Sequence, residues 1–270
     1  DVTDYAMTYV SYVSGYKGPA FDTGLVAGGT VVDPETSDAY EMGLKSTWFD
    51  NRLILNVAVF YTEYDDFQAE TAFDIPESPI PANIVTNVGQ VSTQGIEVEF
   101  LSQPTDNWTI GGGVAYTDGT IDDYPNGNCS GGQKFRGECG PDGTQDLSGG
   151  QLPFTPEWKM NLSTDYTIDM ESAPFTILLG ANVRAQDDVL YELSQDEYTW
   201  QDAYAIVDVR AALAGKRHRY RVTAFVKNLL DKNYASLIFA QPAELLPNAY
   251  IQSVSKYAER TAGVELRYEF

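Results

Sequence analysis

Hydrophobic and polar residues alternate strictly over the last twelve positions of the chain. The apolar parity holds Ala262, Val264, Leu266, Tyr268 and Phe270, and the other parity holds Gly263, Glu265, Arg267 and Glu269. Successive side chains of a strand point to opposite faces, so this segment is predicted to be a strand with one apolar and one charged wall. The pattern continues to the final residue, an aromatic.

The same alternation recurs in nine earlier segments, which predicts ten strands in all. The earlier segments are 3–14, 39–49, 53–61, 85–101, 108–116, 158–166, 175–184, 205–213 and 219–227. Long loops alternate with short turns between them, the short turns lying at 50–51, 102–107, 169–174 and 214–218. This arrangement predicts an all-β, transmembrane antiparallel β-barrel with periplasmic turns, outward loops, an apolar face to lipid and a charged face to a wet lumen.

Aromatic residues lie near the ends of the predicted strands. Three flank short turns and three lie toward long loops, namely Trp48, Trp108 and Phe175 in the first group and Tyr61, Tyr116 and Trp158 in the second. Amphipathic rings at both ends of a strand set are typical of the two interfaces of a bilayer. For any single tryptophan, packing in a core is the commoner explanation, so the placement at strand ends is what favours a membrane.

Composition restricts the function without changing the fold prediction. The 270 residues carry a formal net charge of −22, which argues against nucleic-acid binding because phosphate contacts require clustered Lys and Arg. Mean hydropathy is −0.28, and no apolar run approaches the roughly 20 residues of a transmembrane helix. Barrel strands interleave lumen-facing residues, so a low mean hydropathy is compatible with a membrane. No signal peptide precedes Asp1, and the chain is expected to be a mature form or a fragment.

The two cysteines are predicted to form a disulfide. Cys129 and Cys139 lie ten positions apart in a loop rich in Gly, Asp and Asn, and an oxidising exterior favours their pairing. A zinc site is the weaker alternative because it needs three or four clustered ligands, and the only histidine, His218, is distant in sequence.

No catalytic constellation is evident, so the chain is not expected to be an enzyme and no cofactor is expected. His218 lies in a short turn between Arg217 and Arg219, on the predicted periplasmic side. An outer-membrane hydrolase would need its acid, base and nucleophile together near the outer rim. Two alternatives stay open, a complete ten-stranded barrel enzyme and a soluble all-β adhesion or binding module; the lone histidine argues against the first and the inward-facing charges against the second.

Three stretches resemble the C-terminal part of the barrel of TonB-dependent outer-membrane receptors. They are Pro34–Gln68 (PETSDAYEMGLKSTWFDNRLILNVAVFYTEYDDFQ), Asn87–Phe100 (NVGQVSTQGIEVEF) and Phe225–Ala235 (FVKNLLDKNYA) with the closing Arg260–Phe270 (RTAGVELRYEF). The resemblance implies that residues 1–270 are the last ten strands of a barrel of about 22. It also implies a separate N-terminal plug domain, which closes the lumen and contacts TonB. Such receptors import scarce nutrients, most commonly ferric siderophores, but also cobalamin, haem and saccharides, among which this sequence does not choose.

The resemblance also implies partners and candidate residues. Partners are an extracellular small-molecule ligand, TonB through the absent N-terminal part, outer-membrane lipid, and the barrel-assembly machinery, which would recognise Tyr268 and Phe270 at the C-terminus. Ligand contacts in this family come from loops and the plug apex, so the loop aromatics are the candidates for a substrate path: Tyr16, Phe21, Phe73, Tyr124, Phe135, Tyr191 and Tyr198.

The charged residues predicted to face the lumen are the remaining functional surface. They are Glu41, Lys45, Glu97, Glu99, Lys159, Asp165, Arg184, Asp208, Arg210, Arg219, Arg221, Lys227, Glu265 and Arg267. They either hydrate the wall or contact the plug, whereas those near the outer end could instead line a substrate path. The acidic pairs Asp122–Asp123 and Asp187–Asp188 are solvated loop charges or oxygen ligands for calcium.

Overall fold

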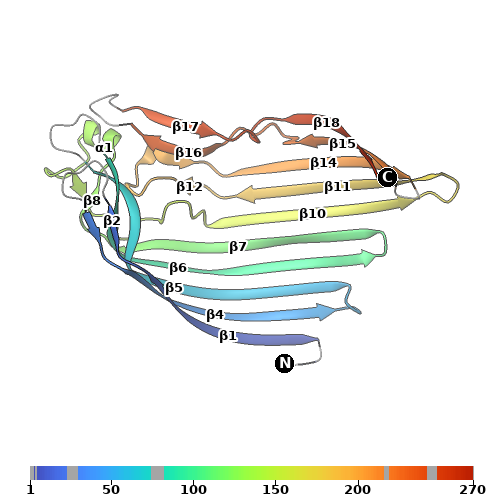
Figure 1. Cartoon of the computed structure of the whole chain (residues 1–270), viewed down its shortest axis with the longest axis horizontal. Coiled ribbons are helices and arrows are strands. Elements are labelled where there is room, and N and C mark those ends of the chain that lie inside the picture. The colour runs from blue at the N-terminus through green and yellow to red at the C-terminus, as the bar shows by residue number, and fades with distance from the viewer. Residues whose placement is uncertain are drawn as a thin grey trace.

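Ten long antiparallel strands form one curved sheet in the computed structural model of the chain (Figure 1). The structure describes residues 3, 5–22, 30–73, 82–215, 219–241 and 248–269. Sheet order follows chain order, with the first and last strands at its two edges. The strands are β1 (Ala6–Lys17), β4 (Glu35–Trp48), β5 (Leu53–Phe73), β6 (Ala82–Thr105), β7 (Trp108–Asp123), β10 (Trp158–Asp169), β11 (Phe175–Gln186), β14 (Tyr204–Gly215), β15 (Tyr220–Lys227) and β18 (Thr261–Tyr268).

The predicted all-β class and the ten strands are confirmed, but the strand predicted over 53–61 extends well beyond its expected end. β5 and β6 stay paired beyond that point, as far as the pair Phe73 and Ala82. Asp66 adopts a left-handed φ of 53° without ending the strand. Phe67 packs against the buried cluster that includes Val88, and this contact favours continued pairing over the turn that two successive aspartates suggest.

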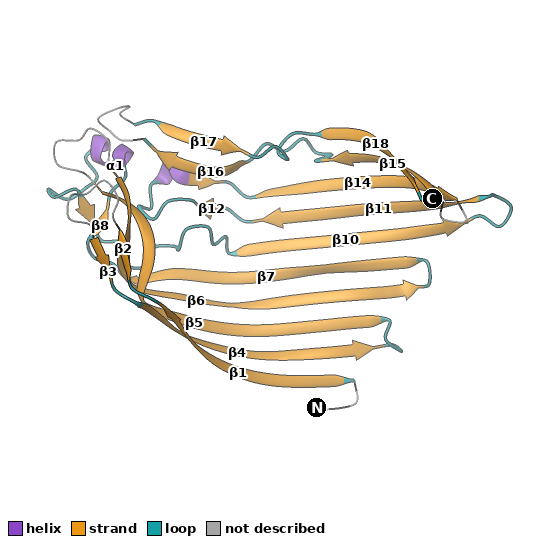
Figure 2. Ribbon diagram, viewed as in Figure 1, coloured by secondary structure: helices purple, strands orange, loops and turns teal. Residues whose placement is uncertain are grey.

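The loops contain short elements of their own, all gathered at one end of the sheet (Figures 1 and 2). They are β2 (Ala20–Asp22), β3 (Thr30–Val32), β8 (Gly127–Asn128), α1 (Gly131–Arg136), β9 (Thr144–Gln145), β12 (Val189–Leu190), η1 (Glu197–Thr199), β13 (Trp200–Gln201), β16 (Ala235–Ala240) and β17 (Tyr250–Val254). The short turns lie at the opposite end of the sheet. We call the segments 124–157, 187–203 and 228–260 the third, fourth and fifth loops.

Short turns form where polar turn residues were predicted. Phe49, Asp50 and Asn51 all have positive φ, between 54° and 66°, and reverse the chain between β4 and β5. Asp106 and Asn107 reverse it between the paired residues Thr105 and Trp108. The short turn 216–218, and His218 with it, lies outside the described residues.

The strand registers place the apolar parity of every strand on one face of the sheet. One row crosses six strands through directly paired residues: Leu44, Val57, Val98, Val114, Met160 and Ala185. Aromatic pairs on this face lie near both strand ends, with ring centroids 5.2 Å apart for Tyr12 and Tyr40, 5.0 Å for Tyr116 and Trp158, and 6.5 Å for Trp108 and Tyr166. In the described part of the chain, no helix has the length and apolarity needed to span a bilayer.

The buried hydrophobic clusters lie at the loop end. One consists of Val88, Val91, Ile121 and Leu147, and a second of Val189, Tyr191, Ala235 and Ile238. The first joins β6 and β7 to the third loop, and the second joins the fourth loop to the fifth. The loops are therefore packed together as a body, and the sheet supports that body.

Candidate functional site

The predicted lumen-facing charges share the face of the sheet opposite the apolar one. Directly paired residues connect them from strand to strand, for example Ala58 with Glu97, Ala115 with Lys159, and Asn161 with Arg184. The remaining strands continue the face through Asn182 paired with Asp208, Gly180 with Arg210, Thr223 with Glu265, and Arg221 with Arg267. We call this surface the polar face. That it lines a lumen stays a prediction.

Tyr9 is a residue of the polar face that the sequence analysis did not single out. Its hydroxyl donates to Glu41 Oε1 at 2.6 Å, and Lys45 Nζ lies 5.5 Å from its ring centroid. The ring lies over Gly43, where any Cβ would collide with it. The charges at Glu41 and Lys45 are therefore held by an aromatic side chain that needs a glycine beneath it.

Opposite charges alternate on the polar face of β10, β11 and β14. Arg184 pairs with Asp208 at 3.3 Å, and Arg210 pairs with Asp165. These side chains are largely exposed apart from Asp208, so each pair contributes little stability and mainly sets a hydrated wall of mixed sign. A hollow of about 380 Å³ between these side chains is lined by Asn182, Arg184, Asp208, Arg210, Lys227 and Tyr257, among others.

Asn228 has a structural role within the FVKNLLDKNYA stretch. It has a φ of 49° where β15 leaves the sheet, and its side chain is fully buried. Its amide nitrogen Nδ2 donates to the carbonyls of Lys232 and Ala258, both at 3.0 Å, and its Oδ1 accepts from the Lys232 amide at 2.9 Å. A short polar side chain that tolerates a left-handed conformation suits this position. The start and the end of the fifth loop are thereby tied together at its base.

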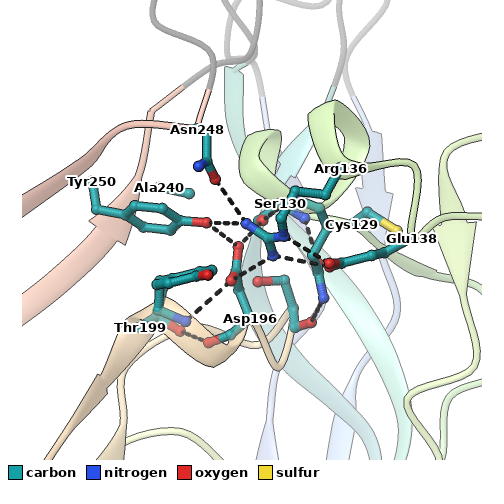
Figure 3. A network of polar contacts seen from close by, with 12 residues as sticks. Cys129, Ser130, Arg136, Glu138, Asp196, Thr199, Ala240, Asn248 and Tyr250 are labelled. Carbon is teal, nitrogen blue, oxygen red and sulfur yellow. Dashed lines mark hydrogen bonds and ion pairs between the residues drawn. The ribbon is translucent and has the colours of Figure 1, made fainter.

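A network of polar side chains joins the third, fourth and fifth loops around Arg136, the last residue of α1 (Figure 3). Its guanidinium donates to both carboxylate oxygens of Glu138, at 2.7 and 2.9 Å, and to Asp196 Oδ1 at 3.0 Å. It also donates to Asn248 Oδ1 at 2.9 Å and to the Tyr250 hydroxyl at 2.6 Å. Asp196 is fully buried and also accepts hydrogen bonds from the hydroxyls of Tyr250 and Ser130.

The predicted disulfide holds the segment that carries Arg136. Cys129 and Cys139 are bonded, with their Cα atoms 6.3 Å apart, on either side of α1. Ser130 caps this helix by accepting from the Gln133 amide, and the Gln133 side chain accepts from the Ser130 amide in return. Both ends of the short helix are fixed, and so is the direction of the Arg136 side chain.

The structure separates the predicted substrate-path aromatics into exposed and packed residues. Tyr16, Phe21, Phe135 and Tyr198 are between 49% and 71% exposed. Tyr124 packs against the cluster around Val88. The Phe73 side chain lies outside the described part of the chain, although its backbone ends β5.

Tyr191 differs from the exposed aromatics, because the structure places it in the loop core. Its side chain is buried, and its hydroxyl donates to the Ala235 carbonyl at 2.8 Å. Its neighbours Val189 and Ile238 belong to the same cluster. A ring packed in this way supports the fourth and fifth loops and is only 8% exposed.

Two further predictions are placed only in part. Tyr268 ends β18 and pairs with Tyr220, whereas Phe270 lies outside the described residues. Asp188 lies in the fourth loop, where burial and the hydrogen bond to Asp187 raise the pKa of its carboxyl. Within the ranges that the structure covers, no group of three or more His, Cys, Asp or Glu side chains is arranged to hold a metal ion.

The sequence and the fold are both similar to known receptors. The chain is 25% identical over 252 residues to the probable TonB-dependent siderophore receptor PiuA of Acinetobacter baumannii and 24% identical over 280 residues to the ferric-pyoverdine 358 receptor of Pseudomonas putida. These matches cover 88% and 100% of this chain. The ferric yersiniabactin uptake receptor FyuA of Yersinia pestis superposes on the whole chain with a TM-score of 0.73 at 20% identity, over 36% of its own length.

The chain spans about a third of the length of the relatives that it matches, 30% of the Acinetobacter protein and 28% of the Pseudomonas protein. A family profile described as "TonB dependent receptor-like, beta-barrel" matches residues 1–229. That match covers most of the chain and nine of the ten long strands. The chain therefore belongs to the β-barrel domain family of TonB-dependent receptors.

Proposed function

We propose that this chain forms part of the barrel wall of an outer-membrane receptor that imports a ferric siderophore with energy supplied through TonB. The family match over residues 1–229 carries this proposal, and the names of the relatives narrow it to siderophore uptake. TonB-dependent receptors belong to the outer membrane of Gram-negative bacteria, which is the location that we propose here. The residues 1–270 would be the last ten strands of a barrel of about 22.

The two faces of the sheet suit this role. On β4, β7 and β10 an aromatic residue recurs eight positions from another, as in Tyr40 and Trp48, Trp108 and Tyr116, and Trp158 and Tyr166. Eight residues rise about 26 Å along a strand. Strands of such barrels tilt by about 35–45°, so this length spans about 20 Å along the membrane normal, which is most of an apolar band about 25 Å tall between two aromatic girdles. The apolar face would contact lipid, and the polar face would contact water and a plug domain.

The loop end is where we propose that the ligand enters. Tyr16, Phe21, Phe135 and Tyr198 are the exposed aromatics available there from the predicted set. The hollow beside Arg184 and Lys227 lies on the polar face of the wall and belongs to the proposed path inward. TonB and the plug would act through the remainder of the protein, and Tyr268 with Phe270 would present the C-terminal strand to the assembly machinery.

Iron uptake tests this proposal. The full-length receptor that contains this segment is expressed in a Gram-negative host lacking its own ferric-siderophore receptors, and uptake of radioactive iron is measured with a panel of hydroxamate, catecholate and mixed siderophores. We expect uptake with at least one complex, and loss of that uptake in a host without functional TonB. Uptake that is unchanged without TonB, or no uptake with any complex, contradicts the proposal.

A further inference from the structure

We infer that Arg136 is a positioning residue that clamps the third, fourth and fifth loops into one body, and that it does not bind the ligand. A guanidinium has five N–H donors. Arg136 makes five hydrogen bonds, two to Glu138 and one each to Asp196, Asn248 and Tyr250. Its donor capacity is therefore fully used inside the protein.

The acceptors come from three separate loops. Glu138 belongs to the third loop with Arg136 itself, Asp196 to the fourth, and Asn248 and Tyr250 to the fifth. Asn248 and Tyr250 lie 112 and 114 positions from Arg136 in sequence, so the guanidinium joins parts of the chain that have no local reason to meet. Figure 3 shows these side chains converging from the different loops on the guanidinium.

Asp196 is saturated in the same way. Its Oδ1 accepts from Arg136 and from the Tyr198 amide at 3.2 Å, and its Oδ2 accepts from Ser130 and from the Tyr250 hydroxyl at 2.9 Å. Four bonds match the lone-pair capacity of a carboxylate. Tyr250 accepts from Arg136 and donates to Asp196, and burial raises its pKa to about 12, so it keeps the proton that it donates.

Burial makes the clamp sensitive to the loss of one member. The Asp196 side chain has no exposure and that of Arg136 only 16%. Removing one partner of a buried ion pair leaves an uncompensated charge, which costs far more than the pair itself contributes. The Arg136 guanidinium also lies 4.8 Å from the ring centroid of Tyr198, which covers part of it.

An anionic ligand can accept a hydrogen bond from this arginine only if one internal hydrogen bond breaks. We therefore assign Arg136 to loop geometry and expect ligand contacts on other groups. The three loops should move together, because the hydrogen bonds that hold the β16–β17 hairpin against α1 in the described part of the loops end on Arg136 or Asp196.

Protease protection tests this inference without any ligand, so its outcome is independent of the proposed import function. The full-length receptor is displayed on intact cells and treated with proteinase K, and cleavage in each loop is followed by mass spectrometry. Arg136→Met should raise the cleavage rate at least about tenfold in both the third loop and the β16–β17 hairpin. Lys256→Met, an exposed lysine of the fifth loop outside the network, should leave both rates unchanged.

Two further variants separate a clamp from a general folding defect. Arg136→Met combined with Asp196→Asn removes both buried charges and should recover much of the protection lost in the single variant. Tyr250→Phe removes one acceptor and one donor and should expose the hairpin to a smaller extent, even if Arg136→Met does not reach the surface. Cleavage confined to the third loop, or no recovery in the double variant, overturns the inference.

Discussion

The backbone amide of Asn228 donates to Oδ1 of Asp208 at 2.8 Å, which joins the base of the fifth loop to the polar face of β14. Asp208 also pairs with Arg184, so a carboxylate predicted only as a lumen charge positions a loop as well. Within the FVKNLLDKNYA stretch, Asn228 therefore has a structural role. Its side chain and its left-handed backbone both depend on that residue type.

Asn228→Ala should destabilise the receptor by roughly 2–4 kcal/mol, because it removes the hydrogen-bond partner of the buried Ala258 carbonyl and of the Lys232 carbonyl and amide, and places alanine in a left-handed conformation. The measurement is thermal unfolding of the purified full-length receptor in detergent. Asn51→Ala is the matched control, since Asn51 has a φ of 66° in an exposed turn. Asn51→Ala places alanine in a left-handed conformation without removing buried hydrogen bonds. Equal losses of stability at the two positions contradict the role assigned to the Asn228 side chain.

Leu266→Arg should impair assembly in the membrane by roughly 2–4 kcal/mol, because an arginine would replace an apolar side chain on the face proposed to contact lipid. Val207→Arg should behave in the same way. Glu265→Arg is the control, since Glu265 neighbours Leu266 on β18 but lies on the polar face. The yield of folded, heat-modifiable receptor in outer-membrane fractions reports the difference, and similar yields for Leu266→Arg and Glu265→Arg oppose the facing assignment.

The strands and their two faces could be predicted because a period of two is a local property of the sequence. Glu265 and Leu266 differ in parity, and the registers place them on opposite faces as the pattern requires. The charges of the polar face were found by the same argument. Tyr9 was missed because an aromatic residue is not expected on the polar face of a strand. Its contacts with Glu41 and Gly43 explain its position there.

The loop network could not be predicted because its members lie far apart in sequence. Arg136 meets Asp196 across 60 positions and Tyr250 across 114. No periodicity marks such contacts. The sequence alone likewise does not distinguish the buried Tyr191 from the exposed loop aromatics. The disulfide was predictable because two cysteines in one loop admit a single pairing within the chain.

Replacing both cysteines, Cys129→Ser with Cys139→Ser, should lower the local stability of the third loop by about 2–3 kcal/mol, because the bond closes a short loop in the unfolded segment. Hydrogen–deuterium exchange of residues 129–139 in the full-length receptor measures this change. Protection of β10 and β11 should stay the same, since those strands are held by their own pairing. Unchanged exchange in 129–139 contradicts the prediction, as it would mean that Arg136 and the helix cap hold the segment without the disulfide.

The contact between the fourth and fifth loops should weaken as pH rises above the range of an ordinary glutamate. Glu192 Oε1 accepts from the Ala240 amide at 2.8 Å, and burial raises the pKa of this carboxyl although that hydrogen bond and one from Ser194 oppose the rise. A carboxyl whose pKa is higher in the folded loop binds its proton more readily there than in the unfolded segment. Its stabilising contribution is therefore complete below about pH 4.3 and is lost as pH rises through the raised folded value.

Glu192→Gln should remove this pH dependence, because the amide keeps an oxygen for Ala240 and has no charge to bury. The ratio of hydrogen-exchange protection between variant and wild type in residues 235–240 is measured at each pH from 4 to 7, so that the intrinsic exchange rate cancels. Glu197→Gln, which removes a charge from an exposed residue of the same loop, is the control and should give a constant ratio. A constant ratio for Glu192→Gln as well contradicts the assignment, since it means that the fourth loop opens without sensing the ionisation of this carboxyl.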